Sequence, residues 1–564
     1  MRKYEENGIL GINLRLTKGI IMKKKEKAAK NLRQIEQEYM EKVVLLFTVL
    51  MVSVFPLYYR NYYSDILTVK YQFCYIMIIA MAVLLLAVKI SIYMIGKSQE
   101  QQKGIKEKFS WKGLSIPEWM ILVFCTVTAI STFTSDYFFE SFWGNEGRYS
   151  GLFLWLLYGL MFALVSRLLK FKGWLMDIFL FSGAIVCILG ILDYFHLDPL
   201  NFKVNIFEGH RDIFTSTIGN VNSFSAIALL YSGAAVTMFG MVTKKERFRT
   251  LMYGICTIIT FMALYTSRSD NAFLGLAAIF AFLPFCLFRK KEGIVRYFAI
   301  IALFLTVGKV LALINTNFPD KVIGMDSISG AISTIPYLGY IVIAMWTGIG
   351  IIYWQSRNLS LKGKADLLEG EAHKGFLWAW AATLALALAL AAFAMYDINF
   401  GNHAEKYGRF GNYLLWNDDW GTHRGFIWRI AIENYSRFSP VHKIFGYGPE
   451  TFGIITKANN GYEMLNRYEE IYDNAHNGFL QYFITMGPIG LISYLGFLIS
   501  SAWIMMKKCK TQPHVMAALL AAVGYAGQEL VSIDQPVVMP LFLLLISMGN
   551  AACRTENMES GNTK

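Results

Sequence analysis

Long apolar runs recur along almost the whole chain, and this feature restricts the possible folds more than any other. A run of about 18 or more apolar residues can cross the hydrocarbon core of a bilayer as a helix. Of the 564 residues, 55% are hydrophobic and 16% are charged, whereas soluble domains carry roughly 25% charged residues. The sequence therefore predicts an all-α polytopic membrane protein with about fourteen transmembrane helices. The runs lie at about 41–58, 71–95, 117–135, 149–166, 174–192, 218–242, 250–267, 270–288, 296–315, 334–354, 376–396, 476–506, 513–531 and 534–552.

The distribution of positive charge predicts how these helices are oriented. The formal net charge of +13 falls in short basic blocks between the apolar runs, and a basic excess in cytoplasmic loops is the usual pattern of membrane proteins. With the N-terminus inside, six inward connections are basic, whereas outward connections hold acidic and aromatic patches such as TSDYFFESFW (134–143). We therefore expect both termini in the cytoplasm, the bilayer as a partner, and no binding of nucleic acid.

The spacing of the runs divides the chain into five parts. One outward connection is far longer than the others, and it includes HRGFIWRIAIENYSRF (423–438), whose apolar residues recur at helical spacing. A long structured loop is usually functional, so we expect polar chemistry at the outer face. The parts are a cytoplasmic basic arm (1–40), transmembrane helices 1–11 (41–396), a long, partly helical extracytoplasmic loop (397–475), the C-terminal transmembrane helices (476–552) and a cytoplasmic tail (553–564).

A polar cluster at the end of the long loop, Asp473-Asn474-Ala475-His476-Asn477, runs directly into an apolar segment. Two interpretations of His476 are open. It is an interfacial anchor, or it is a base, because a neutral imidazole near pH 7 can take a proton from a hydroxyl. The second interpretation would place chemistry at the mouth of a membrane helix.

Several arginines stand at outward positions where a bilayer makes a charge costly. Arg268 lies in a very short link between two runs, so it either snorkels to the interface or faces a watery cavity. Arg424 shares a helical face with Trp428, which fits either a binding surface or a solvated loop helix. Arg148 precedes a run and, taken alone, fits an interfacial anchor.

A second group of polar residues opens the run near 218. Arg211 precedes the turn GNVN (219–222), in which Asn222 caps the following helix or belongs to an anion site at that helix N-terminus. Several outward arginines could hold a diphosphate through paired N–H donors. Together with a histidine base, these residue types fit a reaction in which an alcohol attacks a sugar carbon and a phosphate leaves.

Metal and nucleotide chemistry find less support in the sequence. Asp418 and Asp419 form an acidic pair that could help to hold Mg²⁺ or Mn²⁺, but an isolated pair is typical of a solvated loop. The chain has no GxxxxGK[ST], HExxH or GxSxG motif. We therefore predict no metal site and no cofactor.

Five stretches, in order along the chain, resemble the O-antigen ligase and O-antigen polymerase superfamily of bacterial membrane glycosyltransferases. The last three form the signature region of that family, and GNVN stands where the family more usually has GNPN. The stretches are GNEGRYSG (144–151), HRDIFTSTIGNVN (210–222), SRSDNAFLGL (267–276), HRGFIWRIAIENY with IFGYGPETF (423–452) and NAHNGFLQYFITMGPIGLISYL (474–495).

The resemblance implies a metal-independent, inverting glycosyltransferase. It would move a glycan from undecaprenyl diphosphate to an acceptor hydroxyl at the outer face of the cytoplasmic membrane. The residue that matches the family's loop histidine would activate the acceptor, and the matching arginines would hold the diphosphate. The predicted site consists of the catalytic residues His476, Arg268 and Arg424 and the substrate-binding residues Arg211, Arg148, Asn477 and Asn222.

Alternatives remain open at this point. A ligase and a repeat-unit polymerase share the donor chemistry and differ in the acceptor, which is a glycan, a lipid or a protein hydroxyl. A flippase or exporter of lipid-linked oligosaccharides, a different class, should show internal repeats and ionisable residues near the bilayer midplane, and neither is obvious. A metal-dependent glycosyltransferase using Asp418 and Asp419 would lose activity in EDTA.

Overall fold

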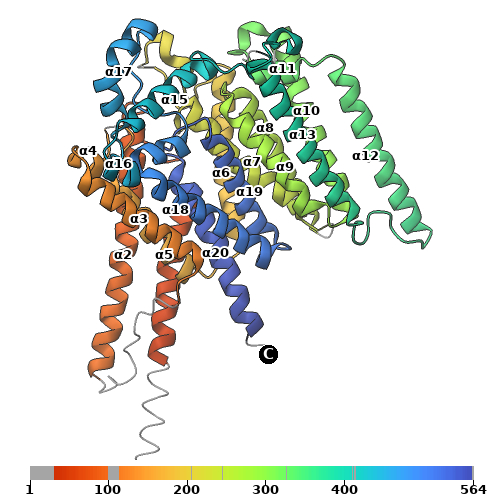
Figure 1. Ribbon diagram of the computed structural model, residues 1–564. Helices are drawn as coiled ribbons and strands as arrows, with labels where there is room; N and C mark the ends of the chain where they lie inside the picture. The colour runs from red at the N-terminus through yellow and green to blue at the C-terminus, as the bar shows by residue number, and fades with distance from the viewer. Residues whose placement is uncertain are drawn as a thin grey trace, which may run out of the picture.

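The protein is described by a computed structural model that covers residues 31–98, 113–145, 147–204, 206–243, 246–325, 327–408, 411 and 414–561. Most of the predicted basic arm, residues 1–30, and the last three residues of the predicted tail lie outside this part. Helices dominate the fold (Figure 1), and the described strands are one short antiparallel pair, β1 (Phe214–Thr215) and β2 (Gly219–Asn220). The predicted all-α architecture is confirmed.

Among the described residues, nine helices are long and apolar enough to cross a membrane, and three more are apolar but shorter. Two further helices, residues 31–53 and α19 (Pro513–Glu529), cover the remaining apolar runs, so each of the fourteen runs coincides with a helix over most of its length. The nine are α2 (Ile66–Ser98), α3 (Ile116–Thr134), α6 (Trp174–Tyr194), α7 (Val221–Met241), α8 (Arg247–Thr266), α10 (Lys291–Asn317), α12 (Leu338–Leu361), α13 (Gly375–Asn399) and α18 (Gly478–Cys509). The three shorter helices are α5 (Leu152–Leu168), α9 (Asn271–Leu287) and α20 (Met539–Gly561).

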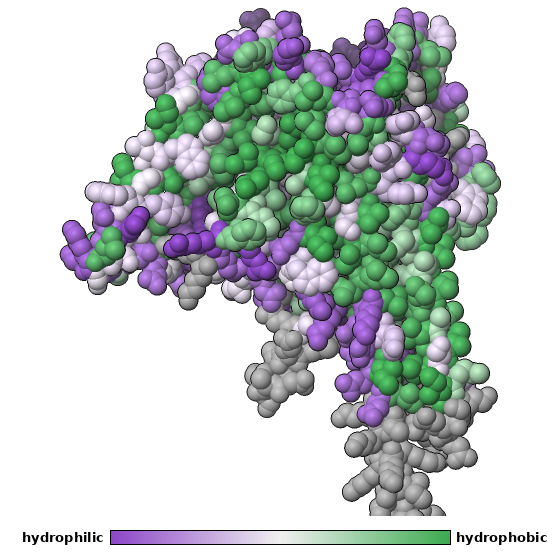
Figure 2. All heavy atoms as spheres, turned by 180° about the vertical axis from the view of Figure 1, so that it is seen from behind, coloured by the Kyte–Doolittle hydropathy of each residue, from purple (hydrophilic) through white to green (hydrophobic). Residues whose placement is uncertain are grey.

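The burial of these helices indicates that the bundle is surrounded by lipid. In α7, 89% of the most apolar window is buried inside the protein, whereas no residue of the corresponding window of α13 is buried. An apolar helix exposed on all sides is stable only against lipid or another apolar partner. A broad hydrophobic belt lies between polar edges on the face shown in Figure 2. The chain is therefore a multi-pass membrane protein.

Contacts between connections show which of them share an end of the bundle. At one end, Arg249 pairs with Asp177 at 3.6 Å, so the connections before α6 and α8 meet. At the other end, the His442 ring contacts the carbonyl of Thr134 at 3.0 Å, and the amide of Ile323 donates to the carbonyl of Tyr194 at 3.0 Å. The second end carries the long connection between α13 and α18.

This long connection, residues 400–477, folds into a small helical unit over that end of the bundle (Figure 1). We call it the outer segment. Its own apolar core includes Phe426, Ile430, Phe452 and Met464, and the helical spacing noted in the sequence supplies the first two. Its described helices include η5 (Ala404–Tyr407), α15 (Trp420–Ser436), α16 (Pro440–Phe445) and α17 (Phe452–Tyr468).

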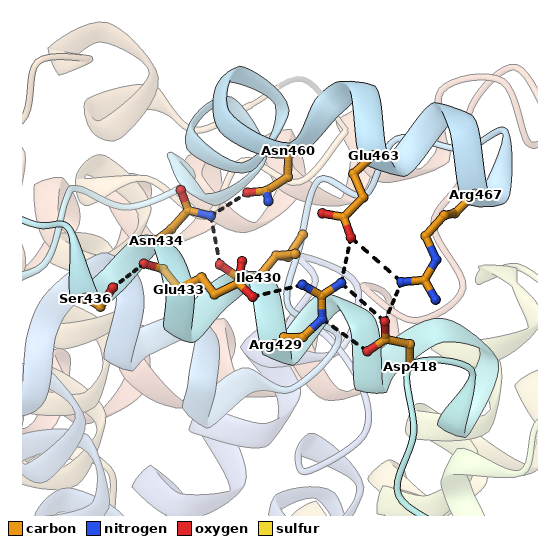
Figure 3. A network of polar contacts seen from close by, with 9 residues as sticks. All are labelled: Asp418, Arg429, Ile430, Glu433, Asn434, Ser436, Asn460, Glu463 and Arg467. Atoms are coloured by element: carbon orange, nitrogen blue, oxygen red, sulfur yellow. Dashed lines mark hydrogen bonds and ion pairs between the residues drawn. The ribbon is translucent and has the colours of Figure 1, made fainter.

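A polar network fastens α17 to α15 (Figure 3). The Arg429 guanidinium donates to Asp418 at 3.2 Å, to Glu433 at 2.8 Å and to Glu463 at 2.7 Å. Arg467, near the end of α17, also donates to Asp418. The carboxylate considered as a metal ligand is thus engaged by two guanidinium groups and holds the outer segment together.

The outer segment is joined to the bundle at a kink in α18. Gly487 has φ 71° and ψ 177°, a conformation open essentially to glycine alone, and Pro488 follows it. A Cβ at Gly487 would overlap the carbonyl oxygen of Ile444 at the end of α16. The helix therefore bends where the outer segment rests on it.

A candidate active site between the bundle and the outer segment

A cleft of about 1080 Å³ lies between the ends of the membrane helices and the outer segment. Four of the seven predicted site residues line it, and they come from four separate parts of the chain: Asn222, Arg268, Arg424 and His476. The convergence of residues more than 250 positions apart in the sequence, which no local pattern requires, makes this cleft the candidate active site.

Arg268 owes its position to the short link between α8 and α9. The residue adopts a left-handed conformation, φ 55°, which reverses the chain between Thr266 and Asn271. Its guanidinium pairs with Asp212 at 3.6 Å and lines the cleft. Arg268 therefore faces the cleft between the bundle and the outer segment.

Arg424 is held at the start of a helix by a strained turn. Gly421, Thr422 and His423 have φ values of 62°, 59° and 66°, so three successive residues are left-handed. Arg424 donates to the carbonyl of Gly421 at 2.6 Å and to the side chain of Asn271 at 3.1 Å. Its Nε is buried without a hydrogen-bond partner within the described chain. A fixed guanidinium with an unused, buried donor is suited to an anionic ligand.

The loop that carries His476 is fixed from two sides. The backbone amide of His476 donates to Asn474 Oδ1 at 2.9 Å, and that of Ala475 donates to Gln481 Oε1 at 3.0 Å. Trp428 of α15 donates its indole N–H to the carbonyl of Ala475 at 2.9 Å. The imidazole therefore has a defined place in the cleft.

The surroundings of His476 keep it neutral. Burial, and after it the charges of Arg424 and Arg148, lower the pKa of His476 to about 4, against the opposing effect of Asp473. The ring is consequently unprotonated at neutral pH and can accept a proton. A negative charge bound beside Arg424 would raise this pKa and make the imidazole a stronger base.

The two asparagines of the predicted site have different tasks. The side chain of Asn222 accepts from the Ser269 hydroxyl at 2.8 Å at the edge of the cleft, while Asn220 caps α7. Asn477 is the cap of α18, where its side chain accepts from the amide of Leu480 at 3.0 Å. Asn477 is outside the lining of the cleft, so its observed contact positions the helix that follows His476.

Arg148 lies behind the histidine loop. It donates to Asp473 through two N–H groups, at 3.1 Å and 2.5 Å, and its side chain is 16% exposed. Beside it, burial raises the pKa of Glu450 to about 7, which Arg148 opposes. Arg148 thus anchors the loop of His476 and is absent from the lining of the cleft.

Arg211 also lies outside the cleft lining. It belongs to the short helix η3 (Glu208–Ile213), where it donates to the carbonyl of Ile206 at 3.2 Å and lies 3.9 Å from Glu208. Its neighbour Asp212 is the residue that reaches the site, by pairing with Arg268. Arg211 is therefore outside the cleft, and a substrate-binding role for it stays a prediction.

Other lining residues escaped the sequence analysis. On α9, Asn271, Leu274, Ala277 and Phe280 recur every three residues and form a stripe that passes from polar to apolar, a signal that was available in the sequence. Phe304, Ile328 and Ile332 continue the apolar part. The outer segment adds Trp420, Thr422, Glu470 and Tyr472, which only the tertiary fold brings to the cleft.

The fold and the cleft define a class: a multi-pass membrane protein with a partly apolar cleft, lined also by arginine, carboxylate and histidine side chains, at one end of its helix bundle. Within this class, residues 321–495 match the family model for O-antigen ligase. The match supports membership of the O-antigen ligase and polymerase superfamily, as the sequence motifs predict. It covers the outer segment and His476, whereas Arg148, Arg211 and Arg268 precede it. No curated protein matches the chain.

Proposed function

We propose that this protein is a glycosyltransferase of the O-antigen ligase or polymerase type. It transfers a glycan from undecaprenyl diphosphate to an acceptor hydroxyl at the outer face of the cytoplasmic membrane, and both of its termini are cytoplasmic. The observation that carries the proposal is the meeting of His476, Arg268 and Arg424 in one cleft with an apolar extension.

The cleft has the composition that a lipid-linked diphosphate requires. Arg268 and Arg424 offer N–H donors at the polar end. From Asn271 to Phe280, the stripe of α9 descends about 14 Å along the bundle, at a rise of about 1.5 Å per residue. Its apolar side chains, with Phe304 and Ile332, face the same space. A prenyl chain would lie along this part while its diphosphate stays between the arginines.

His476 supplies the base for a single displacement. The neutral imidazole takes the proton of the acceptor hydroxyl while the hydroxyl oxygen forms a bond to the anomeric carbon. The bond from that carbon to the diphosphate oxygen breaks, and its electron pair leaves with undecaprenyl diphosphate. The two guanidinium groups stabilise the charge that develops there. Attack opposite the leaving group inverts the anomeric configuration.

A transfer assay tests this proposal. Purified protein is given a lipid-diphosphate-linked glycan and an acceptor, with and without EDTA, and wild type is compared with His476→Ala and Arg268→Gln. We expect both substitutions to abolish transfer and EDTA to leave it unchanged, while Arg437→Gln, an exposed arginine outside the cleft lining, keeps activity within about twofold.

Three outcomes contradict the proposal in different ways. Full activity of His476→Ala would show that His476 is not the base. Loss of transfer in EDTA would indicate a metal-dependent enzyme. Movement of the lipid-linked glycan across liposomes without any transfer indicates a flippase. Size-exclusion profiles of the variants in detergent show whether each one still folds.

A further inference from the structure

The cleft has two walls of different origin. The helix-end wall comes from the membrane helices and includes Asn222, Arg268, Asp270 and the stripe of α9 that begins at Asn271. The loop wall comes from the outer segment and comprises Trp420, Thr422, Glu470 and Tyr472. Arg424 and His476 stand on the outer segment and also line this cleft. The proposed function uses the helix-end wall and assigns no ligand to the loop wall.

Trp420 presents a supported aromatic surface to the cleft. Its ring packs against Trp416 at 5.2 Å and against Trp428 at 5.4 Å between centroids, and those two rings lie 5.4 Å apart. Trp428 is in turn bonded to the carbonyl of Ala475. A ligand stacked on Trp420 is thus held at a fixed position relative to the next residue, His476.

The polar members of the loop wall complement hydroxyl groups. The buried Tyr472 hydroxyl is bonded to His423 Nδ1 at 2.7 Å and also interacts with Glu470, so its orientation is set. Glu470 is exposed and its carboxylate can accept from neighbouring hydroxyls. An aromatic face, a carboxylate and hydroxyls match the apolar C–H face and the polar edge of a sugar ring.

The membrane anchor of the donor decides which substrate uses this wall. A prenyl chain must stay at the depth of the apolar stripe, which places the diphosphate on the helix-end wall. In-line attack brings the acceptor hydroxyl from the opposite side of the anomeric carbon. We propose that the loop wall binds the acceptor through a sugar ring stacked on Trp420, so that the acceptor is the terminal sugar of a glycan and not a protein hydroxyl. This inference rests on the proposed function.

Two-substrate kinetics test the inference. The acceptor probes are the repeat-unit oligosaccharide released from its lipid carrier and a peptide rich in serine and threonine. For Trp420→Ala and Glu470→Gln we expect the KM of the oligosaccharide to rise about tenfold or more, because a stacking or hydrogen-bonding contact is lost. The KM of the lipid-linked donor should stay within about twofold. Glu469→Gln, a neighbouring exposed carboxylate outside the lining, is the matched control.

Hydrolysis of the donor by water separates failure of this inference from failure of the proposed function. Both variants should still hydrolyse the donor at the wild-type rate, since water needs no sugar site. An unchanged acceptor KM in Glu470→Gln, a rise in donor KM instead, or a wild type that prefers the peptide overturns the inference. A wild type that neither transfers nor hydrolyses the donor overturns the proposed function itself. Glu470→Gln keeps the test valid if Trp420→Ala does not fold.

Discussion

The pH dependence of transfer gives the sharpest test of the site. Burial and two guanidinium groups lower the pKa of His476 to about 4, whereas an ordinary histidine titrates near about 6.5. The base must be neutral, so kcat/KM should be constant from pH 8 to about pH 5 and should fall about tenfold per pH unit below about pH 4. At pH 5.5, an ordinary imidazole is about one-tenth neutral, but a pKa near 4 leaves more than about nine-tenths neutral. The expected difference is therefore about tenfold.

Arg424 provides the perturbation. Removing its charge in Arg424→Gln takes away the second largest cause of the low pKa, so the inflection of kcat/KM should move upward. It should stay below about 6.5, because burial remains the largest cause. In wild type the inflection of kcat should lie above that of kcat/KM, since kcat reports the complex in which the diphosphate offsets Arg424. Arg437→Gln, at an exposed position outside the cleft lining, should leave both inflections in place.

The assay is initial-rate transfer in overlapping buffers from pH 3.5 to 8.5, with recovery at pH 7.5 as the check for unfolding. A wild-type inflection near 6.5 would refute the electrostatic reasoning. Activity that rises as the pH falls toward 4 would show that a protonated imidazole is needed, which would refute the role of His476 as a base. An inflection that does not move in Arg424→Gln would mean that the side chains of His476 and Arg424 do not interact.

Three further predictions concern the scaffold. Gly487→Ala should destabilise the protein by about 2 kcal/mol or more through backbone strain and overlap with α16. Gly461→Ala, inside α17 with only one side-chain atom nearby, should instead stabilise it by up to about 1 kcal/mol. Thermal unfolding in detergent measures both. Arg429→Gln should cost about 1 kcal/mol, because its ion pairs are partly exposed, and should speed proteolysis of the outer segment. Arg437→Gln, whose guanidinium has no ion pair within the described chain, should change neither. Arg148→Gln should lower kcat about tenfold with little change in donor KM, because it loosens the loop of His476. Removing its partner Asp473 as well should lower kcat no further. A rise in donor KM would instead make Arg148 a substrate contact.

The sequence predicts most of the membrane architecture because the signal for a spanning helix is local. Each apolar run carries its own information, and α13, with its unbroken apolar sequence and exposed surface, is recognisable without its neighbours. The outer segment is harder to predict. Its helices are amphipathic and short, and their packing depends on ion pairs such as those of Arg429, which join residues up to 34 positions apart.

In the candidate site, too, the residues with a local sequence signal are predictable and those placed by tertiary packing are not. Arg268 is identified by its tight link and His476 by its place at a helix mouth, both of which are local features, and both residues line the cleft. Arg211 has a comparable local setting, yet the hairpin of β1 and β2 and the helix η3 place its neighbour Asp212 toward Arg268. No local pattern marks Glu470 or Tyr472, because their relation to the cleft arises from the packing of the loop on α15.

The two walls of the cleft have a consequence for how such an enzyme can diversify. Most of the helix-end wall is encoded before residue 335 and the loop wall between residues 420 and 472, so the contacts that we propose for the lipid carrier and for the acceptor come largely from separate parts of the chain. Residues such as Trp420 and Glu470 can therefore vary without altering Arg268 or the stripe of α9, whereas Arg424 and His476, on the same outer segment, must be kept. An exchange of Trp420, Thr422, Glu470 and Tyr472 between two members of the superfamily, with Arg424 and His476 retained, is expected to change the recognition of the acceptor and to leave the proposed diphosphate contacts in place.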